Sequence, residues 1–420
     1  MYRYDNYKDS GVEWLGEVPE HWEISSLGKI LLPVSEKNHP DLPLLSITRE
    51  LGVIERDIED QESNHNFIPD DLSNYKVLKK GQFGMNKMKA WQGSYGVSNF
   101  TGIVSPAYYI FNFIKAVNPQ FFHWAIRSKV YISFFGSASD GVRIGQWDLS
   151  KSRMKSIPFV IPSNDEQTAI AQYLDNKTAK IDRAIELEQQ QIELLKERKQ
   201  IVIQTAVTRG LDPNVSFKDS GVEWLGEVPE HWEVKKLKYV LELSNKKEES
   251  RNSNKRYIGM ENVESFTGSL NEVILTAEGI SNSFFKDEIL FGKLRPYLAK
   301  SYLAEFDGIC STEFLVYKAS KEIYNRFALN IFLSYGFIDT VNSSTYGSKM
   351  PRANSEFIAN ILLAIPPLSE QTAIAHYLDE QTAKIDRAIG IKLAQIDKLK
   401  EYKTVLINEV VTGKRRVVLN

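Results

Sequence analysis

The chain has 420 residues, of which 42% are hydrophobic and 25% are charged, so it can bury at least two cores. Its 52 lysines and arginines nearly balance 54 aspartates and glutamates, which excludes a strongly basic chain and requires any nucleic-acid surface to be local. The single cysteine, Cys310, excludes an internal disulfide. The start lacks the pattern of a secretion signal and no run of about 18 apolar residues occurs, so we expect a cytoplasmic protein.

The first element along the chain is a motif that occurs twice. KDSGVEWLGEVPEHWE spans Lys8 to Glu23 and recurs unchanged from Lys218 to Glu233. A second motif, EQTAIAxYLDxxTAKIDRAI, spans Glu166 to Ile185 and recurs from Glu370 to Ile389, with differences only where x is written. Because both motifs recur in the same order, we expect two tandem halves related by a pseudo-two-fold axis.

The segments between these motifs, residues 24–165 and 234–369, barely resemble each other. In both, short apolar and aromatic runs alternate with Gly, Ser and Asn, as in residues 80–109 and 288–317. This pattern is typical of strands joined by turns and indicates mixed α/β domains. Repeated motifs on both sides of dissimilar segments predict two similar domains that perform related tasks on different targets.

The first variable segment contains polar clusters suited to DNA contact, in MNKMKAWQGSYGVSNF and in DGVRIGQWD. Amide and guanidinium groups can form paired hydrogen bonds with base edges, and lysines can contact phosphates. The candidate DNA-binding residues here are Asn86, Lys87, Lys89, Gln92, Asn99, Arg143 and Gln146. Taken alone, an ordinary solvated surface accounts for these clusters better than DNA contact does.

A long helix is expected from Glu166 to about Thr208, because this stretch contains no proline or glycine. Ser163 to Glu166 offer capping groups at its start, and Arg209-Gly210 followed by Pro213 ends it. Apolar side chains at three- and four-residue steps form a heptad seam, extended by Thr178 and Ala206 and interrupted by Glu188 and Lys199. The seam residues are Leu174, Ile181, Ile185, Ile192, Leu195 and Val202.

The second variable segment has its own basic clusters. FGKLRPYLAK combines guanidinium, ammonium and tyrosine groups in a proline-bent stretch, and YGSKMPRAN places more of them on a polar loop. The candidate DNA-binding residues here are Lys293, Arg295, Tyr297, Lys300, Lys349, Arg352 and Asn354. Arg295 could equally lie at the edge of the core and pair with Glu313.

The C-terminal copy of the second motif predicts a matching helix, with Ser369 as a capping group and Gly413 at its end. Its seam is interrupted by Lys392 and Lys403 and extended by Thr382 and Val410. The seam residues are Leu378, Ile385, Ile389, Ile396, Leu399 and Leu406. Each helix should be roughly 65 Å long at about 1.5 Å per residue. A narrow seam of this length requires a partner helix, although each helix could instead pack on its own domain.

Motifs for catalysis are missing from the sequence. We find no phosphate-binding loop, no dinucleotide-binding glycine turn, no zinc-ligand spacing and no Asn/Asp-Pro-Pro-aromatic signature of amino-methyltransferases. His21 and His231, inside the first motif, have no nucleophile or carboxylate at fixed spacing and are therefore expected to be structural. The chain is expected to be neither an enzyme nor a metal-binding protein.

The order WLGEVPEHWE, GKLRPYLAK, DGICSTEF and IPPLSEQTAIAHYLD, the last leading into a long helix, resembles the specificity subunits of type I restriction-modification systems. The resemblance covers essentially the whole chain. The first half has NKMKA in place of GKLRP, and GIVSPAYYIF where the second half has GICSTEFLVY. The first half therefore lacks a GKLRP counterpart, which leaves its DNA-contacting surface less defined.

This resemblance implies an α+β protein with two target-recognition domains, each recognising one half of a split, asymmetric DNA site, and two long antiparallel helices as a coiled-coil spacer. It implies a first recognition domain at residues 1–162, a central helix at 163–212, a second recognition domain at 213–367 and a C-terminal helix at 368–420. It also implies partners: two methyltransferase subunits that use S-adenosylmethionine, and ATP-dependent translocase-nuclease subunits that use ATP and Mg. No cofactor is expected on this chain itself.

Two other interpretations remain open at this point. The paired helices could assemble other proteins, with variable domains that bind protein rather than DNA. Alternatively, the chain could be a nuclease or methyltransferase with a degenerate site. Salt-dependent retention on duplex DNA would favour the specificity subunit, whereas turnover by the isolated chain would favour an enzyme.

Overall fold

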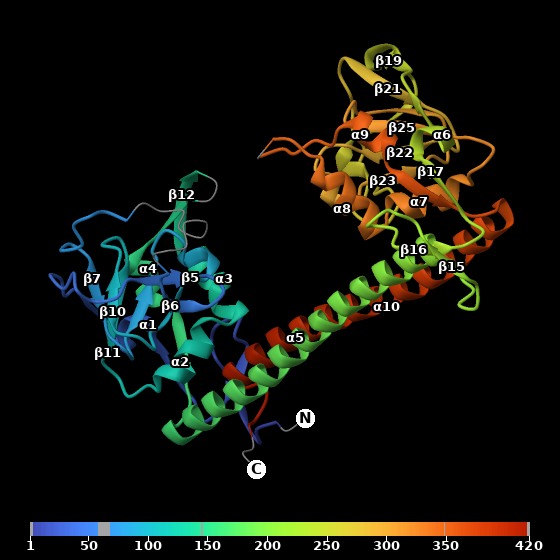
Figure 1. Cartoon of the computed structure of the whole chain (residues 1–420). Coiled ribbons are helices and arrows are strands. Elements are labelled where there is room, and N and C mark those ends of the chain that lie inside the picture. Colours follow the sequence, from blue (N-terminus) through green and yellow to red (C-terminus); the bar gives the residue numbers. More distant parts are fainter. Residues whose placement is uncertain (1–2, 58–67, 144–145, 348, 418–420) are drawn as a thin grey trace. The chain divides into compact units, whose positions relative to one another are not determined.

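The computed structural model describes residues 3–57, 68–143, 146–347 and 349–417. The chain forms two compact units, Met1–Glu188 together with Ala394–Asn420, and Gln189–Leu393 (Figure 1). Each unit contains both strands and helices, so the predicted mixed α/β class is confirmed.

The main sheet of the first unit is antiparallel and has the order β4-β11-β8-β9. Its strands are β4 (Leu31–Val34), β11 (Tyr109–Phe113), β8 (Phe83–Met85) and β9 (Tyr95–Val97). Five strand pairs complete the unit: β1 (Tyr7–Asp9) with β2 (Glu17–Pro19), β3 (Glu23–Ser26) with β14 (Pro158–Ile161), β5 (Leu45–Thr48) with β6 (Gly52–Glu55), β7 (Lys76–Leu78) with β10 (Gly102–Val104), and β12 (Ser139–Arg143) with β13 (Gln146–Leu149).

Short helices cover this sheet: α1 (Leu27–Ile30), α2 (Pro119–Ile126), α3 (Lys129–Ser137) and α4 (Lys151–Ser156). Asn118 caps α2 by accepting hydrogen bonds from the backbone N–H groups of the first turn. Phe122 of α2 is fully buried, and its ring centre lies 5.2 Å from that of Phe83 in β8. An aromatic core therefore holds α2 against the sheet.

The main sheet of the second unit has the order β18-β25-β22-β23. Its strands are β18 (Leu241–Ser244), β25 (Phe314–Ala319), β22 (Ile289–Gly292) and β23 (Ser301–Leu303). A second sheet, β19-β21-β24-β20, consists of β19 (Lys247–Glu249), β21 (Ile280–Phe284), β24 (Gly308–Cys310) and β20 (Arg256–Ile258). The remaining elements are β15 (Phe217–Asp219) with β16 (Glu227–Pro229), β17 (Glu233–Lys236) with β26 (Leu362–Ile365), α6 (Leu237–Val240), α7 (Asn325–Phe332), α8 (Tyr335–Ser343), α9 (Ser355–Asn360), and the 3-10 turns η2 (Ser250–Asn252) and η3 (Met260–Asn262).

The two units share a topology although their variable segments barely match in sequence. In chain order and in pairing, β4, β8, β9 and β11 of the first unit correspond to β18, β22, β23 and β25 of the second. The pair β7–β10 corresponds to β21–β24, and α2, α3 and α4 correspond to α7, α8 and α9. Positions in one unit can therefore be compared with positions in the other through strand register.

Two long helices, α5 (Asn164–Arg209) and α10 (Leu368–Val411), end within a few residues of the expected positions. Ser163 and Glu166 form a reciprocal cap on α5: Glu166 N donates to Ser163 Oγ at 3.4 Å, and the Glu166 carboxylate accepts from Ser163 N at 3.3 Å. The expectation for Ser369 was wrong, because α10 begins at Leu368 and Ser369 lies inside its first turn. Gly210 and Gly413 follow the two helices, each with φ of 75°.

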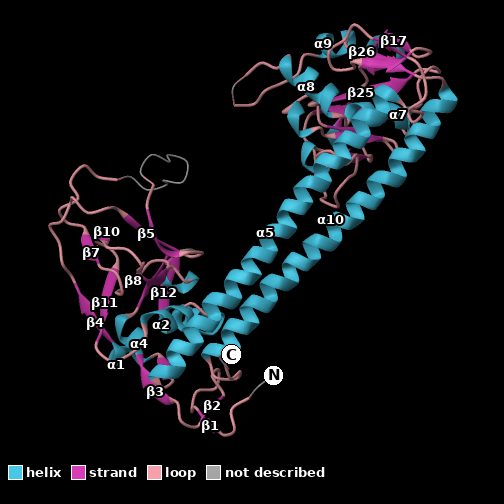
Figure 2. Ribbon diagram, turned by 60° about the horizontal axis from the view of Figure 1, so that its bottom comes forward, coloured by secondary structure: helices cyan, strands magenta, loops and turns pink. Residues whose placement is uncertain are grey.

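Within each unit, the two helices pack against each other. Leu174 of α5 and Leu406 of α10 join one buried cluster in the first unit, and Ile203 of α5 and Leu378 of α10 join one in the second. In both cases an early residue of one helix meets a late residue of the other, so within each unit the helices run side by side in opposite directions (Figure 2). The predicted seam residues are all buried or half-buried.

Two ion pairs cross between the helices at positions where charged residues interrupt the seam. Lys199 Nζ of α5 lies 2.8 Å from the Asp386 carboxylate of α10, within the second unit. Lys403 Nζ of α10 lies 2.7 Å from the Asp182 carboxylate of α5, within the first unit. Each helix thus supplies one lysine and one aspartate, and two of the charges that interrupt the apolar stripe, Lys199 and Lys403, are compensated.

Candidate DNA-binding interface

In the second unit, the GKLRP residues lie on the loop that connects β22 to β23. Gly292 N donates to Lys300 O at 2.9 Å, which closes the loop, and the 3-10 turn η4 (Pro296–Leu298) occupies its tip. Arg295 is exposed, and Tyr297 is 45% exposed. This loop therefore presents a guanidinium and an aromatic ring to solvent on a backbone held at both ends.

The two lysines of this loop differ in their freedom. Lys300 is half-buried, and its Nζ donates to Met260 O at 2.7 Å. Lys293 is also half-buried, but its backbone alone is fixed: its N–H donates to Glu313 O at 2.9 Å and its carbonyl accepts from Ala353 N at 2.8 Å. Lys300 therefore has a structural partner, whereas the Lys293 side chain keeps its ammonium group for other contacts.

The backbone at Arg295 adopts the left-handed conformation, with φ of 51°, and Ala299 does the same with φ of 45°. Such conformations cost non-glycine residues about 1–3 kcal/mol and persist only where surrounding structure imposes them. Here Arg295 N donates to Pro351 O at 2.7 Å, which fixes the turn. The strain directs the Arg295 side chain outward from a rigid base.

The second basic cluster, residues 346–354, lies against this loop. Leu294 and Arg352 form an isolated antiparallel bridge, as do Tyr346 and Arg352. The Arg352 guanidinium holds the Glu313 carboxylate through contacts of 2.9 to 3.2 Å, and these hydrogen bonds raise the pKa of Arg352. The structure thus brings together the two clusters that the sequence separates by about fifty residues.

Glu313 is therefore paired with Arg352, and the alternative pairing with Arg295 was wrong. The reason is topological, because the bridge between Leu294 and Arg352 places the Arg352 side chain beside the start of β25. Lys349 is exposed. Asn354 caps α9, its Oδ1 accepting from Glu356 N at 2.8 Å and Phe357 N at 3.3 Å, which leaves its amide N–H groups as donors.

The first unit contains the same loop between β8 and β9. Asn86 N donates to Ser94 O at 2.9 Å, as Gly292 N does to Lys300 O, and the 3-10 turn η1 (Ala90–Gln92) matches η4. The strand register then aligns the first loop with the second, so that Lys87, Lys89 and Trp91 stand where the second unit has Lys293, Arg295 and Tyr297. The expectation that the first half lacks a GKLRP counterpart was wrong: the counterpart is NKMKAW, disguised because glycine and proline are replaced by Asn86 and Ala90.

The hairpin β12–β13 meets this loop as residues 346–354 meet the other. Lys87 Nζ lies 3.4 Å from the Asp148 carboxylate, and the rings of Trp91 and Trp147 lie 5.1 Å apart at 30°. Arg143 and Gln146 lie in the strands of this hairpin, but their side chains are outside the described part of the chain. The two clusters of the first segment are thus also neighbours.

The other candidates of the first loop vary in exposure. Asn86 shapes the turn, with its Oδ1 accepting from Met88 N at 3.1 Å and its Nδ2 donating to Tyr108 Oη at 3.4 Å. Lys89 and Asn99 are exposed, and Gln92 is half-buried. Of this group, Lys89 is the side chain best placed to reach a ligand.

The repeated motifs anchor each sheet to the long helices of its own unit. Trp22 is fully buried, with its Nε1 donating to Glu166 Oε1 at 3.4 Å, and His21 Nε2 lies 2.9 Å from Glu166 Oε2. Burial would raise the pKa of Glu166, but hydrogen bonds from Ser163, His21 and Trp22 hold it below its ordinary value. The first motif and the second therefore recur together because they bind each other.

The second unit repeats this anchor with Trp232, His231 and Glu370, at 3.1 Å from the indole and 2.9 Å from the imidazole. Each tryptophan also touches the end of the other long helix of its unit. A Cβ atom on Gly210 would lie 3.1 Å from the Trp232 ring, and one on Gly413 would lie 3.1 Å from the Trp22 ring. Glycine is required at both helix ends, both for this close approach and for the positive φ.

Comparison with known proteins gives a match to one family model. The family model described as the type I restriction modification DNA specificity domain matches residues 229–398. The type I restriction enzyme EcoDI specificity subunit of Escherichia coli is 23% identical, over 91% of this chain and 87% of its own length. The putative type I restriction enzyme MjaX specificity subunit of Methanocaldococcus jannaschii is also 23% identical, over 99% of this chain and 98% of its own.

The chain is a relative of the type I specificity subunits. Two solved structures share its fold at 12% identity. One comes from work on complex assembly and conformational transition of the type I R-M system, with a TM-score of 0.69 and coverage of 95% of this chain and 99% of that one. The other is the HsdS subunit of Thermoanaerobacter tengcongensis, with a TM-score of 0.55 and coverage of 95% and 98%.

The resemblance to type I specificity subunits is thus confirmed, and so is the expectation of a non-catalytic recognition subunit, because the matching relatives are themselves specificity subunits. Among the described residues, no group of three or more His, Cys, Asp or Glu side chains is placed to hold a metal ion. None of the helices in the described part of the chain is both long enough and apolar enough to cross a membrane.

Two lysines near the first loop, Lys76 and Lys151, were not among the candidate residues predicted from the sequence. Lys76 Nζ donates to Tyr108 O at 2.7 Å, and Lys151 Nζ lies 4.6 Å from the centre of the Tyr109 ring. Lys76 is followed by Lys79 and Lys80, and Lys151 by Arg153 and Lys155, so each lies in a basic stretch of the sequence. Their position beside the first loop could not be found from these stretches, because it depends on the pairing of β7 with β10 and on α4.

Proposed function

We propose that this chain is the DNA-recognition subunit of a type I restriction-modification complex and that each unit recognises one half of a split, asymmetric site. The observation that carries the proposal is the duplicated loop after β8 and β22. It has the same strand register and a 3-10 turn at its tip in both units, with a basic, basic and aromatic residue at alternating positions. The side chains differ: Lys87, Lys89 and Trp91 against Lys293, Arg295 and Tyr297. Equivalent loops with different donors suit two different half-sites.

In this proposal residues 1–162 and 213–367 are the recognition domains, and residues 163–212 and 368–420 are the helices that set the gap between half-sites. The reciprocal pairs Lys199–Asp386 and Lys403–Asp182 support an antiparallel coiled coil, since they fix the register of the helices within each unit.

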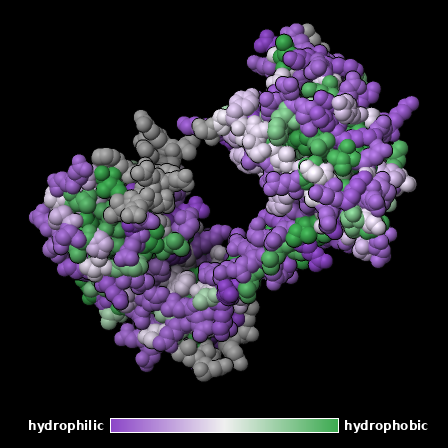
Figure 3. All heavy atoms as spheres, viewed as in Figure 1, coloured by the Kyte–Doolittle hydropathy of each residue, from purple (hydrophilic) through white to green (hydrophobic). Residues whose placement is uncertain are grey.

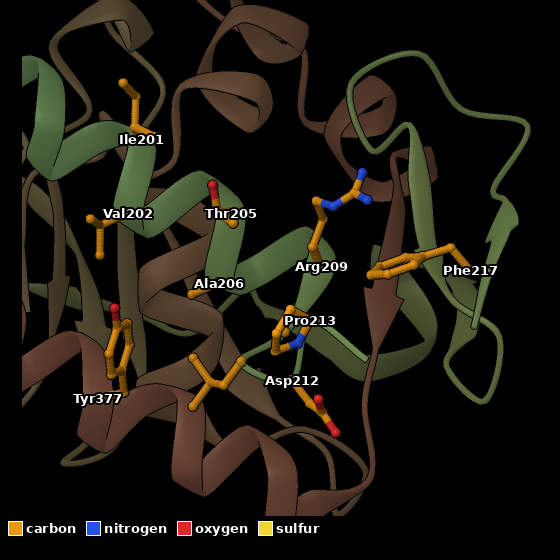
Figure 4. A pocket seen from close by; sticks show the side chains of 11 residues that line it. Ile201, Val202, Thr205, Ala206, Arg209, Asp212, Pro213, Phe217 and Tyr377 are labelled. Carbon is orange, nitrogen blue, oxygen red and sulfur yellow. The ribbon is translucent and has the colours of Figure 1, made fainter. Parts of the chain in front are cut away.

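The same helices would dock two methyltransferase subunits. In support, α5 carries exposed apolar side chains at seven-residue spacing, Leu187, Leu194 and Ile201, with exposed fractions of 41%, 63% and 57%. Figure 3 shows such apolar groups among the hydrophilic surface. Ile201 also lines a hollow of about 450 Å³ with Ala206, Pro213 and Tyr377 (Figure 4). Apolar surface of this kind is typical of a protein interface.

S-adenosylmethionine would then bind the methyltransferase subunits, and ATP with Mg the translocase-nuclease subunits, with this chain supplying recognition alone. In support of partner subunits, a solved structure that shares this fold comes from work on complex assembly of the type I R-M system.

The test is methylation mapping after exchange of one variable segment. Residues 24–165 are replaced by the matching segment of a relative, and DNA exposed to the chain with its methyltransferase is sequenced for methylated adenine. One half of the motif should change while the other half stays, because each domain carries its own base contacts. A change in both halves, or methylation without a sequence motif, would contradict the proposal.

A further inference from the structure

The first unit contains a group of lysines, all but one outside the candidate loops, for which the described residues supply little compensating charge. Lys76 begins β7, Lys87 lies in the loop after β8, Lys151 begins α4, and Lys37 follows β4. Three of them lie near the start of β11: Lys76 Nζ donates to Tyr108 O, Lys151 lies over the Tyr109 ring, and Asn86, next to Lys87, donates to Tyr108 Oη.

The electrostatics of this group are unfavourable in the free protein. Partial burial lowers the pKa of Lys76, and the positive charges of Lys37, Lys151 and Lys87 lower it further. Within the described part of the chain, Asp148 near Lys87 at 3.4 Å is the acidic residue that pairs with any of the four. Like charges held together in this way are stabilised when an anion binds among them.

Comparison with the second unit shows that folding does not require two of these charges, those of Lys76 and Lys151. The register of β7 with β10 matches Lys76 to Asn282 in β21, and Asn282 Nδ2 donates to Phe314 O at 2.8 Å just as Lys76 Nζ donates to Tyr108 O. Lys151, the first residue of α4 after its cap Ser150, matches Ser355, the first residue of α9 after its cap Asn354. A neutral side chain therefore serves the same structural purpose.

We propose that Lys76, Lys87 and Lys151 form a phosphate-binding cluster that holds the DNA backbone beside the loop after β8, at positions that are partly neutral in the second unit. This inference rests on the proposed function and adds a difference between the halves. At these positions, ionic contacts to phosphates should contribute more to binding of the first half-site than of the second. The cluster carries no sequence information, because phosphates are the same at every base pair.

The residues of the second unit supply the test variants. Lys76→Asn with Lys151→Ser removes two charges and keeps the hydrogen bond to Tyr108 O, whereas Asn282→Lys with Ser355→Lys adds two charges at the matching positions. Binding of the full chain, with its methyltransferase partner, is measured by fluorescence anisotropy from about 50 to 200 mM salt. The probes are a duplex that contains the mapped site and a duplex of scrambled sequence.

The first double variant should bind both duplexes more weakly by the same factor, and the slope of log K against log salt should become shallower by about 1 for each lysine removed. The second double variant should steepen that slope. An unchanged slope in both variants would overturn the cluster, as would a loss confined to the specific duplex, which would make these lysines base-reading.

Loss of assembly with the methyltransferase at unchanged DNA affinity would overturn the cluster in favour of a protein contact. If the wild-type chain showed no preference for the mapped duplex, the proposed function itself would fail. If it showed the preference but the variants kept its slope, only the cluster would fail. In the second double variant, a lysine at position 282 can donate to Phe314 O as Lys76 Nζ donates to Tyr108 O. If the first double variant misfolds, the steepened slope of the second is therefore the deciding result.

Discussion

The loops after β8 and β22 share their strand register and a 3-10 turn, but they differ at the tip in backbone conformation and in side chain. Arg295 sits there with φ of 51°, and Lys89 at the matching position has φ of −122°. A guanidinium can donate two parallel hydrogen bonds to one guanine, while an ammonium acts as a point charge that suits phosphates. The difference teaches that the same hairpin can carry different side chains on different local backbones. One substitution with its local backbone can therefore change which hydrogen-bond donors the loop presents.

What stays constant in this comparison is the anchor behind each sheet. Trp22 and Trp232 occupy equivalent sites with equivalent partners, Glu166 and Glu370. The contacts that hold each sheet on the helices are therefore the same in both units, although the variable segments around them barely resemble each other.

The largest expected effect comes from breaking that constant part. Trp22→Ala and Trp232→Ala should each destabilise their own unit by about 3–5 kcal/mol, because each removes a fully buried indole and leaves a cavity. Urea denaturation followed by circular dichroism measures the loss, and hydrogen–deuterium exchange assigns it to a unit. Trp→Phe variants, which keep most of the bulk, are the controls. Unequal losses would show that the two anchors are not equivalent.

An intermediate effect is expected at the loop tips. Arg295→Ala should weaken binding to the cognate duplex by about 1–3 kcal/mol and relax the sequence preference in one half-site. The backbone strain is unaffected, because alanine keeps the Cβ atom. Lys89→Ala should weaken binding to every duplex equally, and both losses are read from titrations on cognate and scrambled DNA.

Arg295→Lys separates the two chemistries. It keeps the charge but loses the paired donors, so cognate affinity should stay low if Arg295 contacts a base. Full recovery with lysine would reassign Arg295 to a phosphate and remove the proposed difference between the loops.

The smallest effect is expected at the helix ion pairs. Lys199→Met should cost about 1 kcal/mol or less in the free energy of unfolding, since exposed partners screen such pairs. Lys403→Met should cost less still, because Lys403 is 28% exposed and Lys199 is 11% exposed. Reversing both charges, with Lys199→Asp and Asp386→Lys, should restore stability in urea titrations. Failure of the reversal would mean that the pair does not contribute through its charges.

The sequence predicted the parts of the fold that depend on local signals. The ends of α5 follow from Ser163, Gly210 and the absence of proline between them, and the pairing of the helices follows from the heptad seam. The spacing already indicated the equivalence of NKMKAW and GKLRPY, since they begin 16 residues before GIVS and GICS, at 86 and 102 and at 292 and 308. Strand register and matching 3-10 turns were needed to establish it, because the two stretches share few residues. The pairing of Arg352 with Glu313 could not be predicted, because it depends on a bridge between distant loops.

The position of each tryptophan between two helix ends has a mechanical consequence. Trp232 touches Glu370 at the start of α10 and approaches Gly210 at the end of α5, so its sheet is attached to the helix pair at two points. A body fixed at one point can swivel, whereas one fixed at two points resists torque about any axis except the line that joins them. A force on the loop after β22 should therefore be transmitted through one indole to both helices of that unit. Rotation of the sheet against the helices would require both contacts of Trp232 to break together.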